Sequence, residues 1–298
     1  MTDSLRIVAC NALPQAWEIV AEWAQARGHR IVLTVTPPAA QAARYGSDPG
    51  RMAEAVGPEG DLLVTAHMRR TVAPVVAALA PDLLVVATFP FRLPESVTRV
   101  PRLGAVNLHP TPLPAGRGPN PQRLVYEGHP DLGAALHRVE PEFDAGRLLS
   151  VRRSPADAYL TPETLLRAWG DLLRAALGEG TARLLAGDPG EPQDEARATH
   201  AAPFTDAERR LDWNEPAAVI QRKATALNAF GPPVARARLG SREVVLADVV
   251  GYPGKVAQPP GFVLARDGDQ VTVACKDGTV RARVAGEGDS LPPRPHAN

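Results

Sequence analysis

The first hundred or so residues alternate between short apolar runs and stretches with helical periodicity. The runs are rich in Val, Ile and Leu and have strand length, whereas the stretches between them place apolar side chains three or four positions apart. We expect strands at residues 5–10, 30–35, 62–66, 83–87 and 105–109, and helices at residues 12–27 and 72–79. Strands that alternate with helices predict a Rossmann-like α/β fold with a mostly parallel sheet covered on both faces.

The second half of the chain changes character. We expect further helices at residues 120–127, 162–185 and 216–227, and short β-type runs at residues 234–239, 243–249, 261–265, 270–274 and 280–284. Asp-Gly pairs at 267 and 277 separate the last three runs, as hairpin turns do. The pattern predicts a catalytic domain at 1–187, a Pro- and Gly-rich linker at 188–205, a small OB-like β-barrel at 206–290 and a loose tail at 291–298.

Charge and cysteine content narrow the classes of protein. Lys plus Arg and Asp plus Glu are 33 each, so the totals show no basic excess of the kind that grips a phosphate backbone, although a local patch stays open. Cys10 and Cys275 are far apart and lack metal-ligand spacing, which disfavours a disulfide framework or a zinc site. No apolar run reaches the roughly 20 residues of a membrane helix, and no secretory pattern opens the chain. We therefore expect a cytoplasmic protein.

The segment richest in chemistry is residues 104–122, GAVNLHPTPLPAGRGPNPQ. Side chains at positions i and i+2 of a strand point to the same face, so Asn107 and His109 project together while Val106 and Leu108 point into packing. The pair ends its strand at the edge where open parallel sheets bind ligands. Prolines stop the strand there and stiffen its exit. The sequence thus predicts a polar site at this strand end.

These side chains suit acyl transfer to an amine. Attack on a formyl carbon develops a negative oxygen, to which Asn107 can donate without ionising and His109 can donate when protonated. A carboxylate is then needed to orient the histidine and accept the proton that leaves the amine. Asp144, in the loop EFDAG at residues 142–146, is the candidate. Spacing alone leaves open whether this loop meets Asn107, and Asp-x-Gly is also a common turn sequence.

Here the residues resemble a known family. NLHPTPLPAGRGPNPQ and, further on, EFDAGRLL are similar to the two motifs of the formyltransferases that use 10-formyltetrahydrofolate. The resemblance maps that family's catalytic trio onto Asn107, His109 and Asp144. It is closest to methionyl-tRNA formyltransferases, because Gln193 and the block at 210–213 resemble their interdomain segment.

The resemblance implies 10-formyltetrahydrofolate as co-substrate, no metal, and a folate pocket beside the strand ends. Phe89 and Phe91 would flank the flat pterin ring, which stacking favours. The implied folate contacts are Phe89, Phe91, Arg92, Leu93, Val139, Glu140 and Glu142. The implied turn and anchor residues are Leu113, Pro114, Arg117 and Gly118. For Arg117, anchoring of the folate and anchoring of the turn are both open.

Two departures from the methionyl-tRNA formyltransferases bear on the acceptor. Residues 10–14 read CNALP where those enzymes have a Gly-Thr-Pro-x-Phe turn, and residues 37–50 offer only Arg44 where they have a basic loop. Few cations weaken a contact with tRNA phosphates. Three functions stay open: formylation of a small or carrier-bound amine, formylation of methionyl-tRNA, and folate binding without turnover. Hydrolysis of the formyl-folate is a variant of the first, with water in place of the amine.

Overall fold

A computed structural model describes residues 4–43 and 46–287, so Arg44 and the tail predicted at 291–298 lie outside the described residues. The chain forms two compact units. The first comprises residues 1–119, 132–154 and 169–200, and the second comprises residues 120–131, 155–168 and 201–298. The domain limits predicted from the sequence stay a prediction, and each unit is described by itself. No helix among the described residues is long and apolar enough to cross a membrane.

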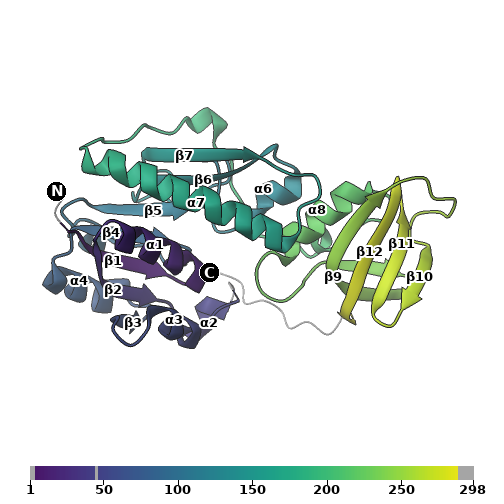
Figure 1. The fold of residues 1–298 in the computed structure, drawn as a ribbon, viewed down its shortest axis with the longest axis horizontal. Helices are drawn as coiled ribbons and strands as arrows, with labels where there is room; N and C mark the ends of the chain where they lie inside the picture. The colour runs from purple at the N-terminus through teal and green to yellow at the C-terminus, as the bar shows by residue number, and fades with distance from the viewer. Residues whose placement is uncertain (1–3, 44–45, 288–298) are drawn as a thin grey trace. The chain divides into compact units, whose positions relative to one another are not determined.

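The first unit is built on a seven-stranded sheet in the order β3-β2-β1-β4-β5-β6-β7 (Figure 1). Pairs among the first five strands are parallel, and β6 runs antiparallel to β5. The strands are β1 (Arg6–Asn11), β2 (Arg30–Thr36), β3 (Leu62–Val64), β4 (Leu83–Ala87), β5 (Ala105–His109), β6 (Asp131–Arg138) and β7 (Leu148–Pro155). The mostly parallel α/β sheet is confirmed, whereas β6 and β7 were not predicted.

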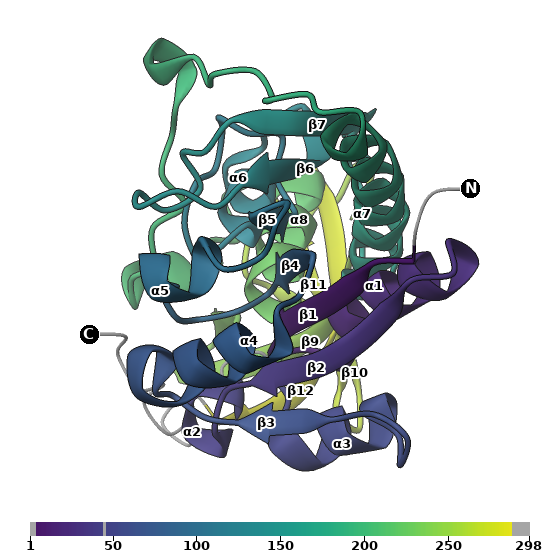
Figure 2. The same cartoon turned by 90° about the vertical axis from the view of Figure 1, so that its left-hand side faces the viewer.

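Helices cover both faces of this sheet, as Figure 2 shows. On one face, apolar residues of α1 and α7 pack on the alternate positions of β1, β4 and β5 that include Ile7, Val85 and Val106. On the other face, α4 and α5 pack on the intervening positions. The helices of the chain are α1 (Pro14–Ala26), α2 (Ala39–Ala42), α3 (Pro49–Val56), α4 (Ala73–Leu79), α5 (Glu95–Thr98), α6 (Gln122–Glu127), α7 (Pro162–Leu185) and α8 (Ala217–Asn228).

A turn of π-helix, which is wider than an α-helical turn, precedes α4. Residues Met68–Val72 form a π-helical turn in which the N–H groups of Val72 and Ala73 donate five residues back, to His67 and Met68. Pro74 lies within the first two residues of α4 and has no N–H to continue the ordinary ladder. We attribute the π turn to this missing donor, which the apolar pattern at 72–79 did not reveal.

The second unit contains a five-stranded sheet in the order β10-β11-β12-β9-β8, whose pairs are antiparallel. The strands are β8 (Arg236–Leu239), β9 (Arg242–Pro253), β10 (Val263–Asp267), β11 (Gln270–Cys275) and β12 (Gly278–Glu287). This confirms a small antiparallel β domain with hairpins near both Asp-Gly pairs, while closure into a barrel stays a prediction. Helix α8 is joined to β9 because Gln221 Oε1 accepts from Gly251 N at 2.7 Å.

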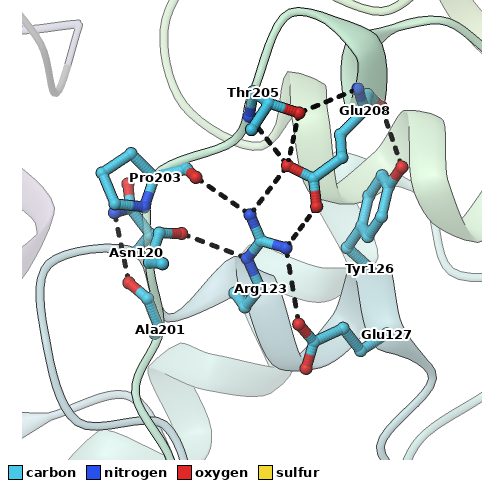
Figure 3. Close-up of polar contacts among 9 residues, drawn as sticks. Asn120, Arg123, Tyr126, Glu127, Ala201, Pro203, Thr205 and Glu208 are labelled. Carbon is cyan, nitrogen blue, oxygen red and sulfur yellow. Dashed lines mark hydrogen bonds and ion pairs between the residues drawn. The ribbon is translucent and has the colours of Figure 1, made fainter.

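Within the second unit, a buried guanidinium ties α6 to residues 201–208 (Figure 3). Arg123 is 8% exposed, and its Nη1 and Nη2 donate to the two carboxylate oxygens of Glu208 at 2.6 and 3.2 Å. It also donates to the carbonyl oxygens of Ala202 and Pro203. Its charge lies over the ring of Phe204, 4.5 Å from the centroid. A buried charge with this many partners is satisfied, and losing one partner should be costly.

Candidate functional site

The site begins on the face of β5 that carries Asn107. Asn107 pairs with Val86 of β4, whose side chain belongs to the core under α4, while Val106 and Leu108 face the opposite core. His109, two positions on, shares the Asn107 face, as the i, i+2 spacing predicts. Asn107 is partly buried and His109 is 7% exposed, so both polar groups are held at the strand end inside the protein.

The loop after β6 brings Asp144 to this pair. Asp144 Oδ1 accepts from Asn107 Nδ2 at 3.0 Å and lies 3.8 Å from His109 Nδ1. Its Oδ2 accepts from the backbone N–H of Gly118 at 2.8 Å. The backbone of Asp144 is left-handed, with φ at 54°, a conformation that costs most residues free energy and that Asp tolerates better than most. The amide, the imidazole and the carboxylate therefore meet in one place.

The carboxylate of Asp144 is held ionised. Burial by itself would raise its pKa, but the charge of His109, the hydrogen bond and charge of His137, and the N–H of Gly118 outweigh burial. The pKa of Asp144 consequently lies well below its ordinary value. At neutral pH this group is therefore an ionised acceptor of hydrogen bonds and does not donate one.

A second histidine, His137, completes the cluster and was missed by the sequence analysis. Strand β6 pairs with β5 in a register that sets His137 opposite Asn107. Its Nε2 lies 3.0 Å from Asn107 Nδ2 and 3.5 Å from Asp144 Oδ1, and its Nδ1 lies 2.8 Å from the carbonyl oxygen of Arg138. The one signal in the sequence was a histidine seven residues before Asp144 in an apolar run, which does not reveal the strand register.

Hydrogen-bond directions follow from these contacts. A carbonyl only accepts, so His137 Nδ1 carries a proton that it donates to Arg138, and in the neutral ring Nε2 accepts from Asn107. Both N–H groups of Asn107 are then engaged, one by Asp144 and one by His137. Likewise His109 Nε2 donates to the carbonyl of Gly116 at 3.0 Å, which leaves Nδ1 facing Asp144. These assignments rest on the network of partners.

The turn between β5 and α6 supports the cluster. Leu113 is buried, Leu113-Pro114 is a cis peptide bond, and Gly118 adopts a φ of 106° that favours glycine. Arg117 contacts Gln193 Oε1 through Nε and Nη2 and forms a two-bond ion pair with Glu195. Arg117 is thus bonded to residues 193 and 195, and its role as an anchor of the folate or of the turn stays a prediction.

The predicted folate contacts lie beside the same strand face. Phe89, Phe91, Leu93 and Val139 are partly buried against the core on the Asn107 side of the sheet. The rings of Phe89 and Phe91 meet edge to face with centroids 5.6 Å apart, so they form one apolar wall and not the two sides of a slot. The other predicted contacts, Arg92, Glu140 and Glu142, are exposed, and the Arg92 guanidinium lies over the Phe143 ring.

Phe89 and Phe91 follow the end of β4, the strand that pairs with β5 beside Asn107. The assignment of each side chain to the folate stays a prediction. Among the residues that the structure describes, no group of three or more His, Cys, Asp or Glu side chains is arranged to hold a metal ion.

Comparison with known proteins gives two family matches. Residues 10–179 match the family described as formyl transferase, and residues 203–289 match the formyl transferase C-terminal domain. A methionyl-tRNA formyltransferase of Xylella fastidiosa is 35% identical over 216 residues, which is 71% of this chain and 69% of that protein.

Solved structures share the fold. HypX from Aquifex aeolicus in complex with tetrahydrofolic acid is 20% identical with a TM-score of 0.71, over 94% of this chain, and this chain spans 44% of HypX. A sugar N-formyltransferase from a Shewanella species is 12% identical with a TM-score of 0.63, over 84% of this chain and 99% of that one. At these identities the likeness concerns the fold alone.

Proposed function

The chain belongs to the formyl transferase family, and on that premise we propose that it transfers a formyl group from 10-formyltetrahydrofolate to the nitrogen of a small amine, with Asn107, His109 and Asp144 as catalytic residues. The observation that carries the proposal is the ionised, buried Asp144, whose Oδ1 faces an amide and two imidazoles at one strand end. An ionised carboxylate in contact with histidine is the arrangement that acid–base catalysis of acyl transfer needs.

The reaction assigns a role to each side chain. The amine nitrogen forms a bond to the formyl carbon, and the bond between that carbon and N10 of the folate then breaks. Asn107 donates to the oxygen that becomes negative between these steps, and so does His109 Nε2, which must first give up its bond to the Gly116 carbonyl. The amine loses a proton to His109, whose imidazolium the Asp144 carboxylate stabilises, and N10 gains that proton as tetrahydrofolate leaves. No net proton is gained or lost by the enzyme.

His137 sets a condition on this mechanism. When the His137 ring is neutral, both N–H groups of Asn107 are occupied, by Asp144 and by His137. To donate to the formyl oxygen, Asn107 must exchange one of these bonds, and the bond to the neutral imidazole is the weaker of the two because Asp144 is charged. We therefore place the oxyanion on the His137 side of the Asn107 amide, with the carboxylate bond retained.

A small amine is the acceptor that we favour, since residues 37–50 carry few cations. Arg44 lies outside the described residues, and the acid of this stretch, Asp48, caps α3 by accepting from the N–H groups of Gly50 and Arg51. Methionyl-tRNA is the second candidate, and the identity of about a third to curated methionyl-tRNA formyltransferases favours it. A cytoplasmic location stays a prediction from the cysteine content.

Release of tetrahydrofolate by the purified protein tests the proposal. The protein is incubated with 10-formyltetrahydrofolate and either methionyl-tRNA or a panel of amino acids and amino sugars, with a no-acceptor reaction as control. Amine-dependent release with a formylated product supports transfer, and the acceptor with the highest kcat/KM identifies its class. Tetrahydrofolate release at the same rate with and without an acceptor means hydrolysis. Folate binding without release means a binding protein, and either result refutes formyl transfer.

A further inference from the structure

The stretch that follows α7, residues 190–200, lies against both loops that form the site. Within the first unit, Arg117 N donates to Thr199 O at 2.9 Å, Thr199 N donates to Pro114 O at 3.2 Å, and Gly116 N donates to Thr199 Oγ1 at 2.9 Å. At the other end of the stretch, Glu191 and Leu148 exchange both backbone hydrogen bonds. We call residues 190–200 the strap. It is bonded to the turn at 113–118 and to the start of β7.

Gln193 is the buried member of the strap. The residue is 9% exposed, and its Nε2 donates to the carbonyl oxygens of Asp144 at 2.7 Å and Gly146 at 2.8 Å. Its Oε1 accepts from Nε and Nη2 of Arg117. All four hydrogen-bonding positions of this amide are therefore used, and its orientation is fixed because carbonyls lie on one side and a guanidinium on the other.

The two loops that Gln193 joins hold the reacting side chains. Gly116 O accepts from His109 and Gly118 N donates to Asp144, so the turn at 113–118 orients both. The backbone at Asp144 is left-handed, and two residues on there is no room for a side chain, because a Cβ on Gly146 would lie 1.8 Å from Arg138 O. A strained loop keeps its geometry only when its surroundings over-determine it.

We propose that Gln193 is a positioning residue for formyl transfer, which holds the Asp144 loop against the turn at 113–118 and so sets the distance between Asp144 and His109. This inference rests on the proposed function. Gln193 acts through the backbone of Asp144, because its Nε2 donates to the Asp144 carbonyl oxygen. Misplacing a reacting group by about 1 Å can cost about 100-fold in rate. Loss of the Gln193 amide should therefore lower kcat more than it changes KM for the folate.

The chain offers a matched control in Gln221 of the second unit. Gln221 is 1% exposed, and its Nε2 also donates to two carbonyl oxygens, those of Tyr159 at 2.8 Å and Leu160 at 3.0 Å. Its Oε1 accepts one N–H, from Gly251. Gln193→Ala and Gln221→Ala thus remove the same group from a similar environment, and a purely structural role predicts similar effects on activity for both.

The experiment compares the full-length variants by steady-state kinetics, thermal unfolding and NMR of the imidazole nitrogens. We expect Gln193→Ala to lower kcat at least about 10-fold with KM for 10-formyltetrahydrofolate within about 2-fold, and Gln221→Ala to leave kcat within about 2-fold at a similar fall in Tm. We also expect Gln193→Ala, and not Gln221→Ala, to shift the ¹⁵N signals of His109. Equal kcat losses in the two variants, or unchanged His109 signals, would overturn the inference.

If Gln193→Ala does not fold, Gln193→Glu supplies the test. It keeps the acceptor for Arg117 and places an oxygen where Nε2 faced two carbonyls, so the same kcat loss and ¹⁵N shift are expected. The ¹⁵N NMR measurement on His109 does not require that the protein be active. If the wild type transfers no formyl group but the Gln193 variant shifts the ¹⁵N signals of His109, the proposed function is refuted and the positioning role stands. If the wild type transfers the formyl group and the variant leaves the His109 signals unchanged, the positioning role is refuted and the proposed function stands.

Discussion

Replacing Asp144 by Asn removes the charge of the site with the least change in shape. Asn adopts the left-handed backbone that residue 144 requires, so the substitution adds no backbone strain. In the wild type, Asp144 accepts from Asn107 through one oxygen and from Gly118 N through the other. An amide in its place must turn an NH₂ group toward one of these donors, and the imidazolium that forms at His109 loses its partner.

The expected loss of rate can be worked out from the distance between Asp144 and His109. A unit charge on Asp144 and one on His109, 3.8 Å apart, interact by about 4 kcal/mol at an effective dielectric constant of about 20. Each 1.4 kcal/mol is about tenfold in rate, and part of the charge effect is replaced by the amide dipole. We therefore expect kcat to fall by about 100- to 1,000-fold, with little change in KM for the folate.

The assay is tetrahydrofolate release at saturating 10-formyltetrahydrofolate and amine, with circular dichroism and thermal unfolding to show that the variant folds. Isothermal titration with the folate separates binding from chemistry. A folded Asp144→Asn enzyme that keeps more than about a tenth of the wild-type kcat would refute the role of the carboxylate. A loss confined to folate affinity would do so as well, because the charge would then act in binding alone.

Three further outcomes are expected. His109→Ala should lower kcat at least about 100-fold while the folded protein still binds folate, measured by the same release assay and titration. His137→Ala should lower kcat less, by about 10-fold, because it removes a partner of Asn107 and leaves Asp144 in place; a loss equal to that of His109→Ala would make His137 a member of the trio. Glu208→Gln should destabilise the fold by about 2–3 kcal/mol in urea unfolding at pH 7, because the buried charge of Arg123 loses its two-bond carboxylate partner and keeps only the more distant carboxylate of Glu127. An unchanged midpoint would contradict this.

The pH dependence of the last variant has a definite sign. The hydrogen bond from Arg123 is the largest effect on Glu208 and, with the N–H and hydroxyl of Thr205, holds the pKa of Glu208 at about 2, below its ordinary 4.5. A lowered folded-state pKa gives stability that is present above about pH 4.5 and lost as the pH falls toward 2. The difference in unfolding free energy between wild type and Glu208→Gln should therefore shrink over that interval, and a difference that stays constant would exclude the linkage.

Local pattern predicted much of the fold. Helix α7 and strands β4 and β5 begin and end where the apolar pattern and the flanking turn residues indicate. The i, i+2 rule also gave the shared face of Asn107 and His109. These features depend on residues that are close together in the chain, so one sequence suffices to infer them.

The local apolar pattern could not predict contacts between residues that are far apart in the chain. His137 comes to Asn107 through the register of an antiparallel strand that was not predicted, and a shift of one residue would have turned it away. Gln193 lies in a stretch whose Pro, Gly and Ala content indicates a loose connection, yet its amide has all its hydrogen bonds satisfied within the first unit. Composition predicts the conformational freedom of a free segment but not the partners that it meets.

The turn at residues 116–118 offers opposite poles of the peptide group to neighbouring side chains: a carbonyl oxygen at Gly116 for His109 and an N–H at Gly118 for Asp144. Adding or deleting a single residue between them would move one of these two backbone groups away from the side chain that it contacts. An engineer who varies acceptor scope in this enzyme should therefore conserve the length of this turn before conserving the identity of any side chain in it.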